Sequence, residues 1–239
     1  MKLDILAFAA HPDDTELACA GILATHIKKG YKVGVIDLTR GELGTRGTAE
    51  IRDKEARKSA ELLGLSVREN LGLEDGFFRN SKENQLTLVQ AIRKYQPDVV
   101  LLNAPTDRHP DHGRAAQLEL DACFVAGLAK VEVSDNEGES LKAWRPKYAY
   151  HYIQSNLLMP DIVIDVSDSW ELKMDAIRCF ASQFYDPNSN EPETFISSPE
   201  FMKLIEARGK EFGHSIGAEY GEGLIKTKML GASDLFDLK

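Results

Sequence analysis

The feature that most constrains this chain is the alternation of short apolar runs with longer amphipathic segments through its first half. The segment from Leu3 to Ala10 is almost continuously apolar, which is typical of a strand buried on both faces of a parallel sheet. The next segment, from about Thr15 to Lys29, places its apolar residues on one helical stripe and ends at Gly30. The same pair of patterns recurs three more times, which predicts a β-α-β-α-β-α-β-α order.

These patterns define the expected elements. Strands are predicted at Leu3–Ala10, Tyr31–Thr39, within 67–75 and at Asp98–Ala104, and helices at Thr15–Lys29, Ala49–Gly64, Lys82–Gln96 and Arg114–Lys130. They predict an α/β fold with a Rossmann-like, doubly wound, mostly parallel sheet in the strand order 3-2-1-4-5. The C-terminal extension is expected to contain strands Lys147–Ile153 and Asp161–Ser167 and helices Ser169–Tyr185 and Pro199–Phe212.

We expect a single domain over residues 1–239. Residues 1–130 would form the Rossmann-like core, and residues 141–239 would complete the sheet and the pocket. The polar and acidic segment Glu132–Ser140 has no periodicity and is predicted to be a solvated connection between these two parts.

Two polar clusters follow predicted strands. The first, His11-Pro12-Asp13-Asp14, comes directly after the first strand, and the second, Asp107 to His112 ("DRHPDH"), follows the fourth. In the predicted order these strands are neighbours, so the clusters face each other where the strand order reverses, the usual ligand site of such sheets. The simpler alternative is helix capping, by Asp13, Asp14 or Thr15 at the first helix and by Asp111 at the fourth.

The paired clusters predict a catalytic metal site. Two imidazoles and one carboxylate, with a fourth position left for water, are a typical donor set for catalytic zinc, although other divalent ions also accept it. One aspartate and one histidine remain, as a general base and a general acid of metal-assisted hydrolysis. Spacing alone does not choose between Asp13 and Asp14, or between His109 and His112, as ligands.

Composition excludes several other classes. The net charge of −9 argues against binding to nucleic acid or to an anionic membrane surface. The three cysteines include no C-x-x-C pair and are expected to be reduced and buried. The first apolar run is short for a signal peptide and no stretch is long enough to span a membrane, so we expect a cytoplasmic protein.

The stretches "AHPDDTELACAGILA" and "DRHPDH" together resemble the LmbE-like, or PIG-L, family of zinc-dependent N-acetylglucosamine deacetylases. The resemblance covers most of the chain. "LTRGELGTRGTAEIRDKEA", "LGLEDGFF" and "FGHSIGAEYGEGL" are most similar to the bacillithiol-biosynthesis branch, which hydrolyses N-acetylglucosaminyl malate. The resemblance implies that His11, Asp14 and His112 bind zinc, that Asp13 is the general base, and that His109 stabilises the oxyanion or protonates the leaving amine.

The resemblance also implies substrate contacts. Arg52 would bind a sugar hydroxyl, Asp75 would help it, and Arg108 could meet the carboxylates of the substrate. The structural alternatives are an ion pair of Arg52 with Glu50 or Glu55, an ordinary turn at Asp75, and bracing of Asp107 or Asp111 by Arg108. The sequence leaves open whether Tyr152, Tyr185 or His214 reaches the pocket.

The expected reaction is hydrolysis of N-acetylglucosaminyl malate to glucosaminyl malate and acetate. The alternative within the class is another N-acetylglucosaminyl conjugate, such as diacetylchitobiose. The alternative from another class is a nucleotide-binding Rossmann-like module without metal catalysis, but the glycine-rich "RGELGTRGT" follows the second strand rather than the first. The expected partner is a small molecule rather than nucleic acid or membrane, and analogy with relatives suggests a homo-oligomer, in several of them a hexamer.

Overall fold

The computed structural model describes residues 1–185, 189–234 and 236. Its strands are β1 (Ile5–Ala9), β2 (Val33–Asp37), β3 (Val67–Asn70), β4 (Val99–Leu102), β5 (Tyr148–Tyr152), β6 (Ile162–Asp165) and β7 (Gly221–Lys226). Its helices are α1 (Asp14–Lys28), α2 (Ala49–Leu63), α3 (Lys82–Tyr95), α4 (Pro110–Ala126), α5 (Trp170–Arg178) and α6 (Pro199–Ser215), with 3-10 turns η1 (Ser167–Ser169) and η2 (Phe195–Ser197).

One sheet joins all seven strands in the order β3-β2-β1-β4-β5-β7-β6. The strands β1 to β5 pair in parallel, and β7 runs antiparallel to both β5 and β6. The predicted α/β fold and its 3-2-1-4-5 order are therefore confirmed, and β1 lies directly beside β4. The order reverses between these two strands, since the chain moves outward from β1 to β3 and then crosses back to β4.

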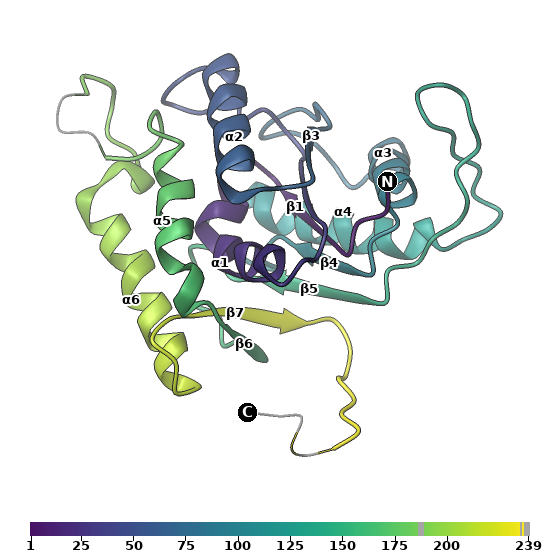
Figure 1. Ribbon diagram of the computed structural model, residues 1–239. Helices are drawn as coiled ribbons and strands as arrows, with labels where there is room; N and C mark the ends of the chain where they lie inside the picture. Colours follow the sequence, from purple (N-terminus) through teal and green to yellow (C-terminus); the bar gives the residue numbers. More distant parts are fainter. Residues whose placement is uncertain (186–188, 235, 237–239) are drawn as a thin grey trace.

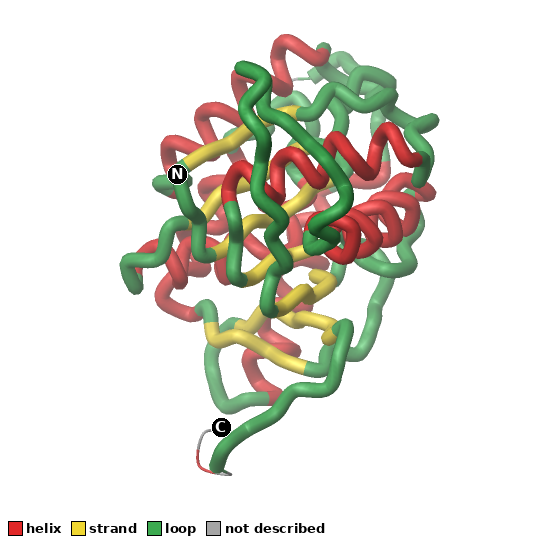
Figure 2. Tube along the Cα trace, turned by 90° about the vertical axis from the view of Figure 1, so that its right-hand side faces the viewer, coloured by secondary structure: helices red, strands yellow, loops and turns green. Residues whose placement is uncertain are grey.

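Helices cover both faces of this sheet, as Figures 1 and 2 show. The first strand explains why both faces are apolar, because its alternate side chains enter two different cores. Ile5 and Ala7 belong to the core under α1, α2, α5 and α6, whereas Leu6 and Phe8 belong to the core under α3 and α4. The continuous apolar run at the N-terminus is thus a strand buried on both sides, as predicted.

Several helix boundaries differ from the prediction, among them the start of the fourth helix and the end of the fifth. The fourth helix begins at Pro110 rather than Arg114, because proline fits the first helical position and the N-cap His109 accepts a hydrogen bond from the Asp111 amide (Nδ1, 3.3 Å). His112 therefore lies in the first turn of α4 rather than in a loop. The fifth helix ends at Arg178, before the predicted Tyr185.

The strand β7 was not predicted. It contains Gly221 and Gly223, which lower the sequence preference for a strand. Packing requires glycine there, because a Cβ atom on Gly221 would lie 2.6 Å from Val163 Cγ1 and 2.8 Å from the Gly213 nitrogen. Within the described part of the chain, no helix is both long enough and apolar enough to cross a membrane.

Candidate active site

The two polar clusters meet at the carboxyl edge of β1 and β4. The first forms a tight turn between β1 and α1, in which the His11 amide donates to Asp14 Oδ2 (2.9 Å) and the Asp14 amide donates to the His11 carbonyl (3.2 Å). The second runs into the first turn of α4. Because β1 and β4 are hydrogen-bonded neighbours, residues about a hundred positions apart in sequence share one site.

Asp13 occupies the N-terminal end of α1 without capping it. Its φ of 119° lies in the left-handed region, which a residue with a side chain rarely adopts, and its carboxylate makes no capping hydrogen bond. The carboxylate instead accepts a hydrogen bond from Arg52 Nη2 (3.0 Å), which also donates to the Pro12 carbonyl. Such strain costs about 1–3 kcal/mol and is typical of functional sites, so helix capping does not explain Asp13.

His11, Asp14 and His112, which the family resemblance implies as metal ligands, lie close together. His112 Nε2 lies 3.1 Å from Asp14 Oδ1, and His11 Nδ1 lies 3.7 Å from Asp14 Oδ2. Ligands of a tetrahedral zinc ion lie about 3.3 Å from one another, given bonds of about 2.0–2.1 Å. The ring nitrogens of His11, His109 and His112 also lie within 4.8 Å of one another, so His109 borders the same space.

Further carboxylates hold the two histidine rings by their outer nitrogens. His112 Nδ1 is 2.6 Å from Asp107 Oδ2, and His11 Nε2 is 3.1 Å from Asp75 Oδ1 and 3.3 Å from Asp111 Oδ2. These contacts leave His112 Nε2 and His11 Nδ1 directed toward Asp14. Carboxylates behind metal-binding histidines commonly fix the tautomer and the ring orientation in this way.

Amide groups hold Asp14 from the other side. Gln154 Nε2 donates to Asp14 Oδ1 (2.8 Å), and Asn103 Nδ2 donates to Asp14 Oδ2 (3.2 Å). The carboxyl group of Glu119, which is fully buried in α4, accepts a hydrogen bond from the backbone amide of Asn103 (2.8 Å). Sequence reasoning missed Gln154 and Asn103, although both lie at the carboxyl ends of predicted strands, where the same topological argument would have placed them.

The charge pattern of the site favours a cation between the two histidines and Asp14. Burial lowers the pKa of His112, but the carboxylates of Asp14 and Asp107 outweigh it and raise this pKa to about 9. Burial would raise the pKa of Asp14, but the charge of His112 and hydrogen bonds from His11 and His112 hold it well below its usual range. A divalent ion would supply the positive charge that this nitrogen and oxygen donor set attracts, so the residues fit a metal.

The pKa values of the two remaining predicted residues, Asp13 and His109, shift in the directions opposite to those of Asp14 and His112. Burial raises the pKa of Asp13 to about 7, although the Arg52 guanidinium limits the rise. Burial, together with the charges of His11 and His112, lowers the pKa of His109 to about 4. Asp13 can therefore exchange a proton near neutral pH, whereas His109 is a neutral imidazole there.

A cavity of about 490 Å³ opens over these groups, a size common for small-molecule sites. Its lining includes all eight predicted site residues, namely His11, Asp13, Asp14, Arg52, Asp75, Arg108, His109 and His112. Asp75 also accepts from the Leu43 amide through Oδ2 (2.9 Å). Helix α6 and η2 supply an apolar wall that sequence reasoning missed, with Phe195, Phe201 and Ile205 among its residues.

The structural alternatives for the arginines receive no support. Arg52 contacts Asp13 rather than Glu50 or Glu55, and the guanidinium of Arg108 lies 4.3 Å from the ring centroid of Phe195. Asp111 is instead paired with Arg114 (2.5 Å). Three residues whose reach was left open do not line this cavity: Tyr152, whose hydroxyl donates to the Phe8 carbonyl, and the exposed Tyr185 and His214.

The fold and the site together define a Rossmann-like α/β protein with a candidate metal centre at its topological switch point. The chain belongs to the PIG-L family of de-N-acetylases, since residues 6–123 match the family model described as GlcNAc-PI de-N-acetylase. The conserved protein TT1542 from Thermus thermophilus has the same fold, with a TM-score of 0.85 and 32% sequence identity over 97% of this chain and 98% of that one.

Curated relatives have several activities. The chain is 29% identical to a diacetylchitobiose deacetylase of Thermococcus kodakarensis, over 92% of this chain and 81% of the relative. It is 30% identical to a 4-oxalmesaconate hydratase of Pseudomonas putida, over 74% and 73%. It is 26% identical to a probable N-acetyl-alpha-D-glucosaminyl L-malate deacetylase of Bacillus subtilis, over 77% and 84%.

Proposed function

We propose that this chain is a zinc-dependent hydrolase that removes the N-acetyl group from an N-acetylglucosaminyl conjugate. The observation that carries the proposal is the site itself: the imidazoles of His11 and His112 and the carboxylate of Asp14 converge in a cavity beside the strained, buried Asp13 and beside His109. This donor set together with a separate base and donor is what metal-assisted amide hydrolysis requires. The deacetylases among the relatives support the same reaction.

The ion would be held by His11, Asp14 and His112. When bound there, a divalent ion supplies polarisation of the acetamide carbonyl and makes a water molecule more acidic. Asp107, Asp75 and Asp111 keep both imidazoles in the orientation that binding needs, and Gln154 and Asn103 do the same for Asp14.

Asp13 acts as the general base. A carboxyl group with a pKa of about 7 can take a proton from the attacking water and later return it to the leaving amine. Arg52 keeps the carboxylate of Asp13 in place through its 3.0 Å hydrogen bond. Both Arg52 and Asp75 also line the cavity, so each can contact a sugar hydroxyl while it holds Asp13 or His11.

His109 acts as the hydrogen-bond donor to the oxyanion. Its Nδ1 accepts from the Asp111 amide (3.3 Å), so the proton of the neutral ring is on Nε2. Burial, which lowers the pKa of His109, favours this neutral ring, whose Nε2–H group is a hydrogen-bond donor. Of the two roles that the sequence left open for His109, this favours oxyanion stabilisation, and the amine then receives its proton from Asp13.

The preferred substrate is N-acetylglucosaminyl malate, which would give glucosaminyl malate and acetate for bacillithiol synthesis. The second candidate is diacetylchitobiose, which the name of the Thermococcus relative supports. Because the Pseudomonas relative is named as a hydratase, the test must separate hydrolysis from hydration. A metal-free nucleotide-binding module receives no support, because the turn after β1 is filled by His11 to Asp14 rather than by glycines.

The test is acetate release from three substrates, the malate conjugate, diacetylchitobiose and free N-acetylglucosamine, with 4-oxalmesaconate as the hydration control. We expect the protein to release acetate from at least one sugar. Removing the metal with a chelator should abolish this activity, and adding zinc should restore it. H112A should lose both metal and activity, whereas H26A, whose ring Nδ1 contacts the Ile22 carbonyl 2.8 Å away, should retain both. Hydration of 4-oxalmesaconate without acetate release from any sugar would refute the proposed reaction.

A further inference from the structure

Two arginines in the cavity have no carboxylate partner in the part of the chain that the structure describes. Three arginines line the cavity, and of these Arg52 is paired with Asp13 (3.0 Å), whereas Arg108 and Arg208 have no such ion pair. The aspartates of the cavity are each engaged by Arg52, a histidine or an amide. The cavity therefore offers positive charge that the catalytic groups do not use.

Arg108 lies between the end of β4 and the start of α4, four residues before His112. Its guanidinium lies 4.3 Å from the ring centroid of Phe195, and that ring packs edge-to-face against Phe201 at 5.5 Å. A guanidinium at this distance from a ring can contact it with its face, which leaves the N–H groups at its edge available for hydrogen bonds. Arg108 is exposed, so these donors can reach a ligand that enters the cavity.

Arg208 reaches the same cavity from α6, a hundred residues further along the chain. Its two terminal nitrogens donate to the carbonyl of Gln154 and to that of Ser155 (2.9 Å). A guanidinium carries five N–H groups, so three remain after these two hydrogen bonds. Burial lowers the pKa of Arg208, and the charges of Asp107 and Glu211 offset this only in part, without forming an ion pair with it. A ligand anion in the open cavity would therefore stabilise the guanidinium further.

Resting on the proposed function, we propose that Arg108 and Arg208 form a subsite for a negatively charged aglycone. The anion would be a carboxylate or a phosphate attached to the N-acetylglucosamine, held by the arginine edges while the acetamide faces His11 and His112. A neutral disaccharide would leave both arginines without an ion-pair partner. Because the chain carries a net charge of −9, an anionic substrate needs such local cations in order to bind.

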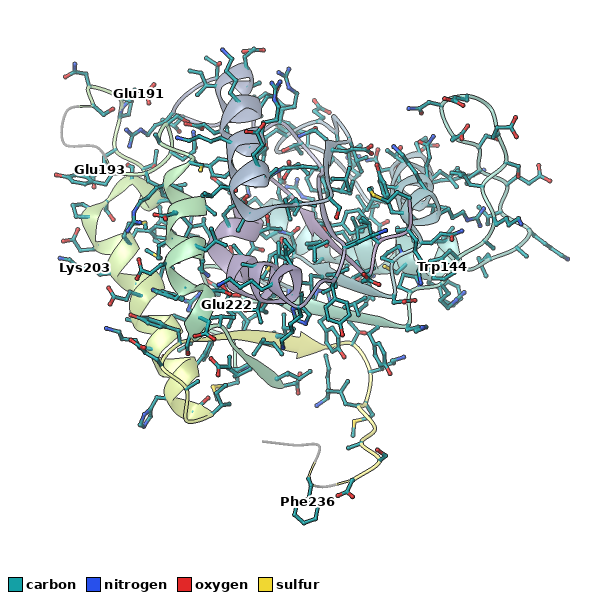
Figure 3. All side chains as sticks on the ribbon, in the orientation of Figure 1. Trp144, Glu191, Glu193, Lys203, Glu222 and Phe236 are labelled. Carbon is teal, nitrogen blue, oxygen red and sulfur yellow. The ribbon has the colours of Figure 1, made fainter. Side chains whose placement is uncertain are left out.

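One acidic residue opposes this subsite. Glu193 lines the cavity from the loop between α5 and α6, and Figure 3 shows it on the outer side of the molecule. Its carboxylate is exposed to solvent, which screens its effect on a bound anion. Removing this charge in E193Q should still increase the preference for an anionic substrate, but only slightly.

The test compares kcat/KM for N-acetylglucosaminyl malate, N-acetylglucosamine 1-phosphate and neutral diacetylchitobiose. In R108Q and in R208Q we expect the ratio of charged to neutral turnover to fall by about ten- to a hundred-fold, and R208K should recover part of it. The two charged substrates identify the anion as carboxylate or phosphate. The matched control is R145Q, since Arg145 is also stacked on a phenylalanine (4.5 Å from Phe124) and donates to a backbone carbonyl, but lies outside the cavity.

Calorimetric titration with free malate and with inorganic phosphate provides a readout that does not need turnover. The wild-type chain and R145Q should bind one of these anions, and R108Q and R208Q should bind it at least about ten-fold more weakly. Equal losses on charged and neutral substrates, a wild-type preference for diacetylchitobiose, or no anion binding by the wild-type chain would each overturn the subsite. Anion binding without acetate release from any sugar would instead refute the proposed function and leave the subsite standing.

Discussion

Asp13 and Asp14 are adjacent in sequence but lie in opposite surroundings. Asp14 accepts three hydrogen bonds, from Gln154, Asn103 and the His11 amide, and faces His112, whereas Asp13 is buried with Arg52 as its only ion-pair partner in the described residues. The charge of His112 and hydrogen bonds from the His11 and His112 side chains hold the pKa of Asp14 well below its usual range, whereas burial raises that of Asp13 to about 7. The sequence could not choose between the two carboxylates, and the structure supports the roles that the family resemblance implies.

The first prediction separates these two roles. D13N should keep bound zinc but reduce kcat by about a hundred-fold or more, because an amide cannot accept the proton of the attacking water. D14N should instead lose zinc, since a neutral amide is a much poorer ligand. Metal content by elemental analysis and kcat on the same preparations check both statements. A D13N protein without zinc would show that the two residues have exchanged roles.

The second prediction concerns the carboxylate behind His112. D107A should weaken zinc affinity by about 10–100-fold, because His112 then loses the 2.6 Å partner that orients its ring. D107N should lose less zinc affinity, since its amide oxygen can still accept a hydrogen bond from His112 Nδ1. Competition with a fluorescent chelator measures the affinity, and D175A, which removes an exposed aspartate of α5, is the control. Unchanged affinity in D107A would exclude an orienting role for Asp107.

At the scale of elements, the parts that the sequence predicted are those whose signals are local. Strands β1, β2 and β4 are buried apolar runs bounded by turn residues, and their order follows from general rules of α/β connection. The two histidine clusters could be placed because each directly follows such a strand. Arg208 could not be identified as a site residue in the same way, because it belongs to no motif and reaches the cavity only after α6 has packed.

The third prediction tests the close packing of α6 on the last strand. A Cβ atom on Gly213 would lie 2.7 Å from the backbone of Tyr220, which cannot move like the end of a side chain. G213A should therefore destabilise the protein by about 1–3 kcal/mol in spite of the better helix propensity of alanine. G113A is the matched helical control, since its Cβ would meet only the Pro105 carbonyl at 3.5 Å. Urea unfolding of both variants measures the difference, and equal effects would contradict the packing argument.

At the scale of the whole molecule, the core contains an acid that is uncharged at neutral pH. Glu119 is fully buried in α4, and burial raises its pKa to about 8. Its Oε2 accepts from the Asn103 backbone amide (2.8 Å), whereas its Oε1 has no hydrogen-bond partner among the described residues. The folded chain therefore holds a proton on Glu119 that the unfolded chain releases above a pH of about 4.3.

The fourth prediction follows from that proton. Because the folded pKa is raised, the contribution of Glu119 to the free energy of unfolding is complete below about pH 4.3 and is lost as pH rises to about 8. The loss is at most about 1.4 kcal/mol for each pH unit in this window. E119Q should remove this dependence, so the stability of the wild-type chain relative to E119Q should fall as pH rises. Urea unfolding of the metal-free proteins between pH 5 and 8 tests this, and parallel curves would contradict it.

The position of the site between β1 and β4 has a consequence for metal binding while the chain is being synthesised on the ribosome. The first two proposed ligands, His11 and Asp14, are synthesised early. The third, His112, is in α4 and is synthesised about a hundred residues after His11. At about 5–20 residues per second, this interval lasts on the order of 5–20 seconds. During that time the nascent chain has half a binding site and nothing to hold a metal firmly. Firm binding of the ion therefore requires that β1 and β4 have paired. Metal binding by stalled nascent chains of increasing length would show at which chain length this pairing occurs.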